Sequence, residues 1–332
     1  MQTKFIKSLA TAAVIAAAFG AQSSYAGQRV ITIDGSSTVY PITEAVAEEF
    51  QNETNTRVTV GISGTGGGFK KFCRGEIDIS DASRPIKQKE IDKCKAAGIQ
   101  FIEIPVAFDA LTVVINPKND FAKTMTVAEL KKIWEPAAQG KLKTWKSINP
   151  AWPDQKLALF GPGADSGTFD YFTEAVVGKS KSSRGDFTAS EDDNILVKGV
   201  AGDEGGLGYF GYAYYEENKD ILTAVAIKKD AASKAVLPSK EAIEDGTYTP
   251  LARPIFIYVN ATRAAFDPKL KAFVDYYLAK SKPLIEEVKY VPLPTAEQAA
   301  VVAHWKALKP GSGFDGKAQV GVKMSDILKN IK

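Results

Sequence analysis

The residues best suited to chemistry lie in a stretch of glycines and hydroxyl side chains between Phe160 and Glu174. Ser166, Gly167 and Thr168 stand there where an apolar run ends and a helical pattern begins. The free N–H groups and the positive dipole end of a helix start suit an oxyanion, and glycine lets a ligand come close. An ordinary capped helix is the alternative interpretation of this one stretch.

The same order of strand, small hydroxylic turn and helix occurs twice more upstream. A strand-like run at 30–33 precedes Ser36, Ser37 and Thr38, and a second run at 58–62 precedes Thr65 and Gly66. Successive backbone N–H groups in such turns can form a nest that holds an anion. Three such turns in one chain favour a shared anion site over three unrelated helix caps.

Two arginines are candidates for the positive charge of such a site. Arg84 follows Ser83, and the next residue, Pro85, favours an extended backbone at Arg84. A guanidinium there can hold an oxyanion through two charge-assisted hydrogen bonds, although a surface pair with Asp81 is the alternative. Arg184 lies in a polar loop, from which it reaches the same cleft or stays solvated.

Other kinds of chemistry find little support in the sequence. The single histidine, His304, falls in an expected C-terminal helix. Nucleophilic catalysis by a serine or cysteine that a histidine activates therefore has little support. The segment 64–69 starts like a dinucleotide fingerprint but ends in Phe69 where the last glycine belongs, and no P-loop lysine pattern occurs. We therefore predict no metal, no cofactor and no enzymatic activity, with a phosphatase using Ser37 or Ser166 as a remote alternative.

The first 26 residues predict a cleavable signal peptide and hence a periplasmic protein. Lys4 and Lys7 form a basic start, residues 9–19 form an apolar run too short to span a bilayer, and residues 24–26 fit a cleavage site. Removing the two lysines takes the formal net charge from +3 to +1. This near-neutral balance argues against nucleic acid as a partner, because nucleic acid requires a basic face.

The two cysteines, Cys73 and Cys94, predict a disulfide. An even pair in an exported chain is typical of a bridge, with two free thiols as the alternative.

The remaining 306 of the 332 residues predict a two-domain α/β protein with largely parallel sheets, because strand-like and helical patterns alternate. We expect strands near 29–34, 57–62, 76–80, 100–105, 110–116, 156–160, 207–211, 222–227 and 254–260, and helices near 41–53, 66–74, 87–97, 126–134, 167–177, 190–200, 268–280 and 295–306. Two extended segments, 104–117 and 248–259, are candidate crossovers that would act as a hinge. They predict lobe I as residues 27–105 plus 256–332 and lobe II as residues 106–255.

Five motifs, in this order, resemble the periplasmic phosphate-binding proteins of ABC importers, the PstS type. The motifs are Gly35–Thr38, Gly64–Gly67, Asp78–Pro85, Asp165–Phe169 and Gly206–Tyr209, and they cover about residues 30 to 260. The resemblance implies a two-lobed, type II-like periplasmic binding protein with the anion buried in the cleft. It also implies inorganic phosphate and a membrane permease as partners, and we expect a monomer.

By position, the resemblance and the turns together give a set of expected ligand-binding residues: Ser36, Ser37, Thr38, Thr65, Gly66, Ser83, Arg84, Asp165, Ser166, Gly167, Thr168 and Arg184. The chain departs from the family in two places. Pro162 stands where members usually carry an arginine, and Ser83 where they often carry an aspartate that accepts the phosphate proton.

These departures leave the charges of the site open. We expect Arg84 to take the cationic role, and Asp81, Asp165 or the Ser83 hydroxyl to accept the proton. Another tetrahedral oxyanion, such as phosphite, arsenate or sulfate, is the alternative ligand.

Overall fold

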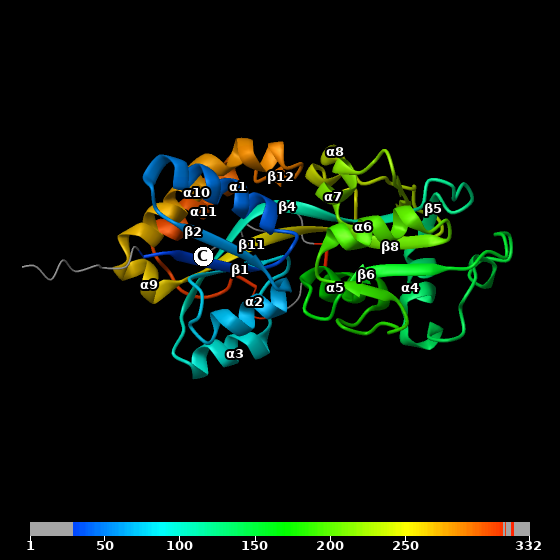
Figure 1. Cartoon of the computed structure of the whole chain (residues 1–332), viewed down its shortest axis with the longest axis horizontal. Helices are drawn as coiled ribbons and strands as arrows, with labels where there is room; N and C mark the ends of the chain where they lie inside the picture. Colours follow the sequence, from blue (N-terminus) through cyan, green and yellow to red (C-terminus); the bar gives the residue numbers. More distant parts are fainter. Residues whose placement is uncertain (1–28, 315, 317–319, 322–332) are drawn as a thin grey trace, which may run out of the picture.

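Residues 29–314, 316, 320 and 321 are described by a computed structural model, in which two lobes lie side by side (Figure 1). The predicted signal peptide, residues 1–26, lies outside the described residues. None of the helices within the described ranges is long and apolar enough to cross a membrane.

The first lobe is built on a sheet in the order β2-β1-β3-β11-β4. Its three parallel strands are β1 (Ile31–Gly35), β2 (Val58–Ile62) and β3 (Ile79–Ala82). Its helices and last strand are α1 (Tyr40–Thr54), α2 (Gly64–Phe72), α3 (Gln88–Ala96), α9 (Ala261–Phe266), α10 (Pro268–Glu287), α11 (Thr295–Lys306) and β12 (Val291–Pro292). Helices α1 and α10 cover one face of the sheet, and α2 and α3 lie on the other (Figure 1).

The second lobe continues the sheet through β4-β8-β6-β7. Its strands are β6 (Ala158–Pro162), β7 (Thr188–Ser190) and β8 (Gly206–Gly211), with the short β5 (Thr124–Thr126), β9 (Thr223–Ala224) and β10 (Ala226–Lys228) at its margins. Its helices are α4 (Val127–Trp134), α5 (Gly167–Phe172), α6 (Asp193–Gly202), α7 (Tyr212–Glu217) and α8 (Lys240–Glu244), with 3₁₀ turns at Pro136–Ala138 and Trp145–Ser147 and a π-helical turn at Thr173–Val177.

Two long strands join the lobes. β4 (Phe101–Ile115) pairs with β11 (Ala252–Asn260) over its first ten residues and with β8 over its last five. All fifteen residues of β4 are buried, and apart from Glu103, Asp109 and Thr112 they are apolar. The two extended segments expected to cross between the lobes are these strands. The predicted boundaries at 105/106 and 255/256 fall inside them, and the division into lobes at those residues stays a prediction.

The structure tests the predicted disulfide and the predicted strand directions. The disulfide between Cys73 and Cys94 is confirmed, and it ties the end of α2 to α3. The sheets are less parallel than expected, because β11 runs antiparallel to both β3 and β4, and β4 runs antiparallel to β8.

Candidate functional site

Two threonines from different lobes meet at the centre of the molecule. Thr38 lies in the turn between β1 and α1, and Thr168 is the second residue of α5. Their hydroxyl oxygens are 3.1 Å apart, and both residues are buried. The turn after β1 and the helix start after β6 therefore converge, as their similar sequences suggested.

A second hydroxyl pair lies beside the first. Thr65, in the first turn of α2, and Ser83, just after β3, have their hydroxyl oxygens 3.2 Å apart, and the Ser83 N–H donates to the Thr65 hydroxyl at 3.1 Å. A Cβ at Gly167 would lie 2.4 Å from the Thr65 hydroxyl oxygen and 2.5 Å from that of Ser83. Gly167 thus packs directly on this pair, and only a residue without a side chain permits that approach. Since Gly167 precedes Thr168, the two pairs form one site, which we call the hydroxyl cluster (Thr38, Thr65, Ser83, Gly167 and Thr168).

The cation at the hydroxyl cluster is Arg253 of β11. Its Nη2 donates to Thr168 Oγ1 at 2.8 Å and to Thr38 Oγ1 at 3.3 Å. Its Nε and Nη2 also donate to Asp109 Oδ2, at 3.2 and 2.9 Å, because β4 and β11 pair these two residues in register. Its Nη1 is buried and has no hydrogen-bond partner among the described residues. The Arg253 guanidinium therefore retains an N–H donor, on Nη1, that can bind an anion.

Two buried carboxyl groups shape the field around Arg253. Burial raises the pKa of Asp109, and the neighbouring guanidinium offsets only part of that effect. Burial likewise raises the pKa of Asp193, in the first turn of α6, to about 7, with Arg253 acting in the opposite direction. The low-dielectric surroundings therefore disfavour extra negative charge on the protein and leave the guanidinium as the dominant charge.

The serines of the first and third turns take part in hydrogen bonds that hold the backbone. The Ser36 N–H donates to the Asp81 carbonyl at 3.0 Å, and the Ser37 carbonyl accepts from the Tyr214 hydroxyl at 3.1 Å. The Ser166 hydroxyl caps α5 by accepting from the Thr168 N–H at 3.1 Å. At Ser166 the ordinary helix cap, the alternative interpretation of this stretch, is therefore present alongside the cluster.

Two other expected ligand residues, Gly66 and Asp165, join the lobes to each other. The Gly66 N–H donates to the Asp165 carbonyl at 2.7 Å, and Lys70 Nζ lies 2.6 Å from Asp165 Oδ2. These contacts bridge α2 of the first lobe and the loop before α5 of the second.

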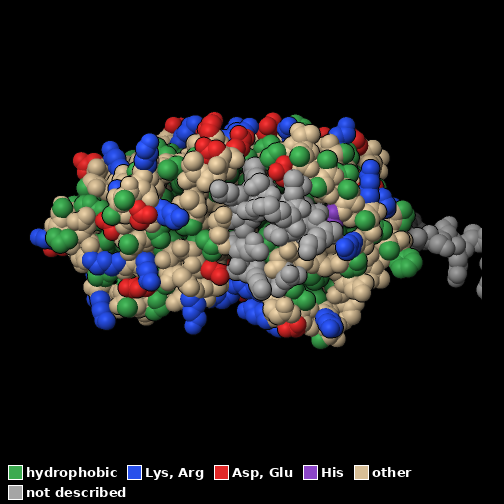
Figure 2. All heavy atoms as spheres, turned by 180° about the vertical axis from the view of Figure 1, so that it is seen from behind, with side chains coloured by type: hydrophobic (Ala, Val, Ile, Leu, Met, Phe, Trp, Pro, Cys, Tyr) green, Lys and Arg blue, Asp and Glu red, His purple; other side chains and the backbone are tan. Residues whose placement is uncertain are grey.

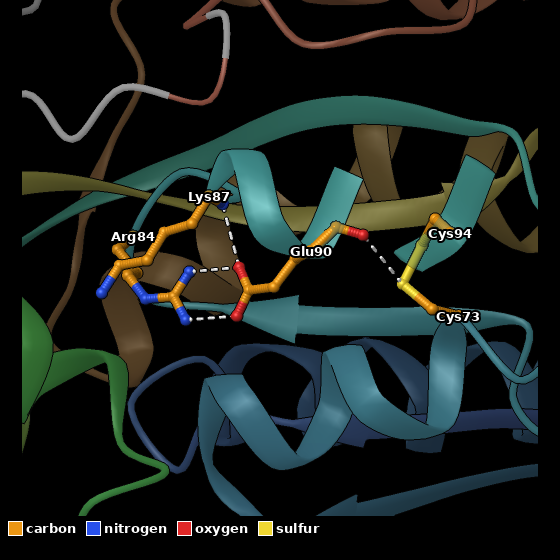
Figure 3. Close-up of a disulfide and its surroundings, with 5 residues drawn as sticks. All are labelled: Cys73, Arg84, Lys87, Glu90 and Cys94. Atoms are coloured by element: carbon orange, nitrogen blue, oxygen red, sulfur yellow. Dashed lines mark hydrogen bonds and ion pairs between the residues drawn. A yellow bond between two sulfur atoms is a disulfide. The ribbon is translucent and has the colours of Figure 1, made fainter. Parts of the chain in front are cut away.

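The expectation that Arg84 supplies the cation needs correction. Its Nη1 and Nη2 both donate to Glu90 of α3 at 2.8 Å (Figure 3), and its Nε donates to Asp170 of α5 at 2.7 Å. Burial works against the charged form, but the pairing with Glu90 and Asp170 outweighs it and raises the pKa of Arg84. The physical reason is that the carboxylates of Glu90 and Asp170 bind the Arg84 guanidinium, which was expected to bind the anion at the hydroxyl cluster.

Arg184 and Asp81 also lie apart from the hydroxyl cluster. The Arg184 guanidinium donates to Asp186 and to the carbonyls of Ile133 and Leu142, all within the second lobe. Asp81 accepts from the Thr43 hydroxyl of α1 at 3.1 Å. The structure therefore does not bring either residue to the cluster.

Sequence reasoning missed Arg253, although a signal for it exists. Arg253 precedes Pro254 at the start of an apolar strand, and Asp109 interrupts the apolar run of β4. Opposite charges inside two buried strands indicate a pair, because an unpaired buried charge is costly.

The fold and the central site define the class of the protein. Residues 20–281 match the family model of the PBP superfamily domain, so the chain belongs to the superfamily of two-lobed periplasmic binding proteins, and the predicted fold class is confirmed. It is 51% identical to Protein SphX of Synechococcus elongatus, over 97% of this chain and 94% of that one. It is 41% identical to the phosphate-binding protein PstS of Staphylococcus saprophyticus, over 83% of this chain and 84% of that one.

A solved structure supports the same family assignment. The crystal structure of a possible phosphate binding protein from Planctomyces limnophilus is 48% identical, covers 85% of this chain and 99% of its own, and superimposes with a TM-score of 0.63. Within its superfamily, the chain belongs to the family of the PstS phosphate-binding proteins, which confirms the resemblance found in the motifs.

Proposed function

We propose that this protein binds inorganic phosphate between its lobes and delivers it to the membrane permease of an ABC importer. Family membership supports the substrate class, and the hydroxyl cluster with Arg253 supports the site. The observation that carries the proposal is the buried Arg253, which already contacts Thr38 and Thr168 and has a further donor in Nη1.

The number of donors is sufficient for tight binding. Micromolar affinity corresponds to about 8 kcal/mol, and each hydrogen bond to a charged group contributes roughly 1.5–3 kcal/mol. The hydroxyls of Thr38, Thr65, Ser83 and Thr168 and the Arg253 guanidinium provide at least five donors in one place. Five such bonds amount to roughly 7.5–15 kcal/mol, so the middle and upper part of this range meets the requirement and leaves a margin for the costs of association and lobe closure.

Selectivity among tetrahedral oxyanions is a separate question. Strict discrimination of phosphate from sulfate needs a group that accepts the phosphate proton, since such a group repels a fully ionised anion. Asp81 faces Thr43 and Asp165 pairs with Lys70, so neither carboxylate is a direct part of the hydroxyl cluster. We keep phosphite, arsenate and sulfate as the alternative ligands.

We propose that the protein performs no chemistry on its ligand. The hydroxyls of the cluster pair with each other and with an arginine, an arrangement suited to holding an anion rather than to activating a nucleophile. A p-nitrophenyl phosphate assay with the purified chain tests this, and turnover above a buffer blank would favour the phosphatase alternative.

Isothermal titration calorimetry of the chain from Gly27 onward tests the main proposal. Phosphate should bind with one-to-one stoichiometry at micromolar or lower Kd and should raise the melting temperature. Competition with sulfate, phosphite and arsenate at neutral pH then identifies the preferred anion. If phosphate produces no binding heat and does not shift the melting temperature, the proposal is contradicted.

The remaining expectations concern the cell. We propose that the chain is exported through a cleaved signal peptide, works in the periplasm as a monomer and binds no nucleic acid. Cell fractionation, N-terminal sequencing and size-exclusion chromatography check the first two points.

A further inference from the structure

A small basic pocket opens at the seam between the lobes, directly outside the hydroxyl cluster. Its volume is about 70 Å³. Three residues of its lining, Gly66, Arg84 and Asp165, are chain neighbours of Thr65, Ser83 and Ser166. The pocket therefore adjoins the segments that carry the hydroxyl cluster, and at its edge the Gly66 N–H donates to the Asp165 carbonyl.

The lining of the pocket is strongly biased in charge. It contains five cationic side chains and two carboxylates. Arg84 pairs with Glu90, and Lys70 pairs with Asp165, so these four charges largely cancel. Lys181 of the second lobe lies 3.8 Å from Asp170 Oδ1, so the excess comes mainly from Lys89 and Lys93 of α3. Figure 2 shows Lys and Arg side chains along the lower edge where the lobes meet.

The arrangement of Lys89 and Lys93 suits the attraction of an anion. They are exposed and stand four residues apart on one helix, where like charges destabilise the helix by a few tenths of a kcal/mol. The chain from Gly27 onward has a formal net charge of only +1, so the molecule as a whole exerts little attraction on an anion. A local concentration of lysines at the seam provides that attraction where it is needed.

We propose that this pocket, which we call the vestibule, is an outer binding site that attracts phosphate and passes it to the hydroxyl cluster when the lobes part. The inference rests on the proposed function. Opening the lobes breaks the contact between Gly66 and Asp165, and the vestibule then becomes continuous with Thr65 and Ser83. The anion thus moves from exposed lysines to buried hydroxyls without crossing a neutral surface.

The test compares two double variants in stopped-flow mixing with inorganic phosphate. Lys89→Gln with Lys93→Gln removes two vestibule charges. Lys269→Gln with Lys280→Gln removes two exposed charges from α10, on the opposite face of the sheet. At low ionic strength the vestibule variant should associate about three- to tenfold more slowly than the control variant, with dissociation rates equal within twofold. The difference should vanish at 1 M salt, where the Debye length falls to about 3 Å.

Two results would overturn the vestibule, and they differ from a failure of the proposed function. Equal association rates in the two variants, or an effect confined to dissociation, would show that these lysines do not guide the anion, while phosphate binding itself would stand. If the unmodified chain fails to bind phosphate in calorimetry, the proposed function falls, and the vestibule falls with it.

Discussion

Replacing Arg253 by methionine, together with Asp109→Asn, should remove most of the affinity for phosphate. Arg253 is fully buried, its Nη2 donates to Thr38 and Thr168 of the hydroxyl cluster, and its Nη1 is a buried donor without a hydrogen-bond partner among the described residues. Two charge-assisted hydrogen bonds at roughly 1.5–3 kcal/mol each amount to about 3–6 kcal/mol. At 1.4 kcal/mol per factor of ten, Kd should rise by about 10²- to 10⁴-fold.

The second substitution keeps the result interpretable. Arg253→Met alone would leave Asp109 as a buried carboxylate without its partner, which typically costs about 3–5 kcal/mol of stability. Asn at 109 retains the shape of the side chain and removes the charge. Melting curves of the double variant should therefore stay close to those of the unmodified protein in the absence of phosphate.

Isothermal titration calorimetry measures the effect, with Arg74→Gln together with Glu76→Gln as the matched loss of one ion pair. Arg74 is 58% exposed and pairs with Glu76 at the surface, so replacing the pair should change Kd by less than twofold. A well-folded double variant at Arg253 and Asp109 that binds phosphate within threefold of the unmodified protein would refute the assignment of Arg253.

The other predictions concern the hydroxyls, the close-packed glycine and the contact between the lobes. Thr168→Val should weaken phosphate binding about 10- to 150-fold in calorimetry, whereas Thr112→Val, at another buried threonine, should not; equal effects would argue against a specific hydroxyl contact. Gly167→Ala should raise Kd at least tenfold because its Cβ would overlap the Thr65 hydroxyl, whereas Gly202→Ala meets no atom within 4 Å and should bind normally. For Asp170, burial opposes ionisation but its cationic partners outweigh it and hold its pKa below the usual range, so its ion pair stabilises the fold above about pH 4 and is lost as the pH falls through the lowered pKa. The melting-temperature deficit of Asp170→Asn should accordingly shrink in acid, and a deficit independent of pH would contradict this reasoning.

Local signals explain which parts of the fold could be predicted from the sequence. Hydroxyl-and-glycine turns at strand ends depend on residues close in the chain, and the structure does bring Thr38, Thr65, Ser83 and Thr168 together. The predicted helix at 295–306 coincides with α11. The long strand β4 was expected as two strands, at 100–105 and 110–116. Its register with β11 shifts at Pro105–Ala107, where a bulge accommodates the proline and the strand continues.

The residues next to Arg84 and Arg253 do not show which of the two is the cation of the site, because that depends on pairs far apart in the chain. Arg84 resembled an anion-binding residue in its own segment, but Asp170, 86 residues later, takes its Nε. Arg253 sits in an apolar strand and becomes the central cation only because Asp109, 144 residues earlier, pairs with it in register. Which guanidinium remains available to a ligand is thus decided by tertiary competition for carboxylates.

Residues of the hydroxyl cluster are followed directly in the chain by residues that contact the other lobe. Ligand binding and the contacts between the lobes should therefore be coupled. Thr65 and Ser83 belong to the hydroxyl cluster, while the next residues, Gly66 and Arg84, bind Asp165 and Asp170 of the other lobe. If the lobes close on the ligand, as proposed, we expect these contacts to form together with the hydroxyl cluster and each contact to raise the population of the closed form. Because apparent affinity scales with the population of the binding-competent state, substitutions at the contacts between lobes should change Kd without removing any donor to the anion.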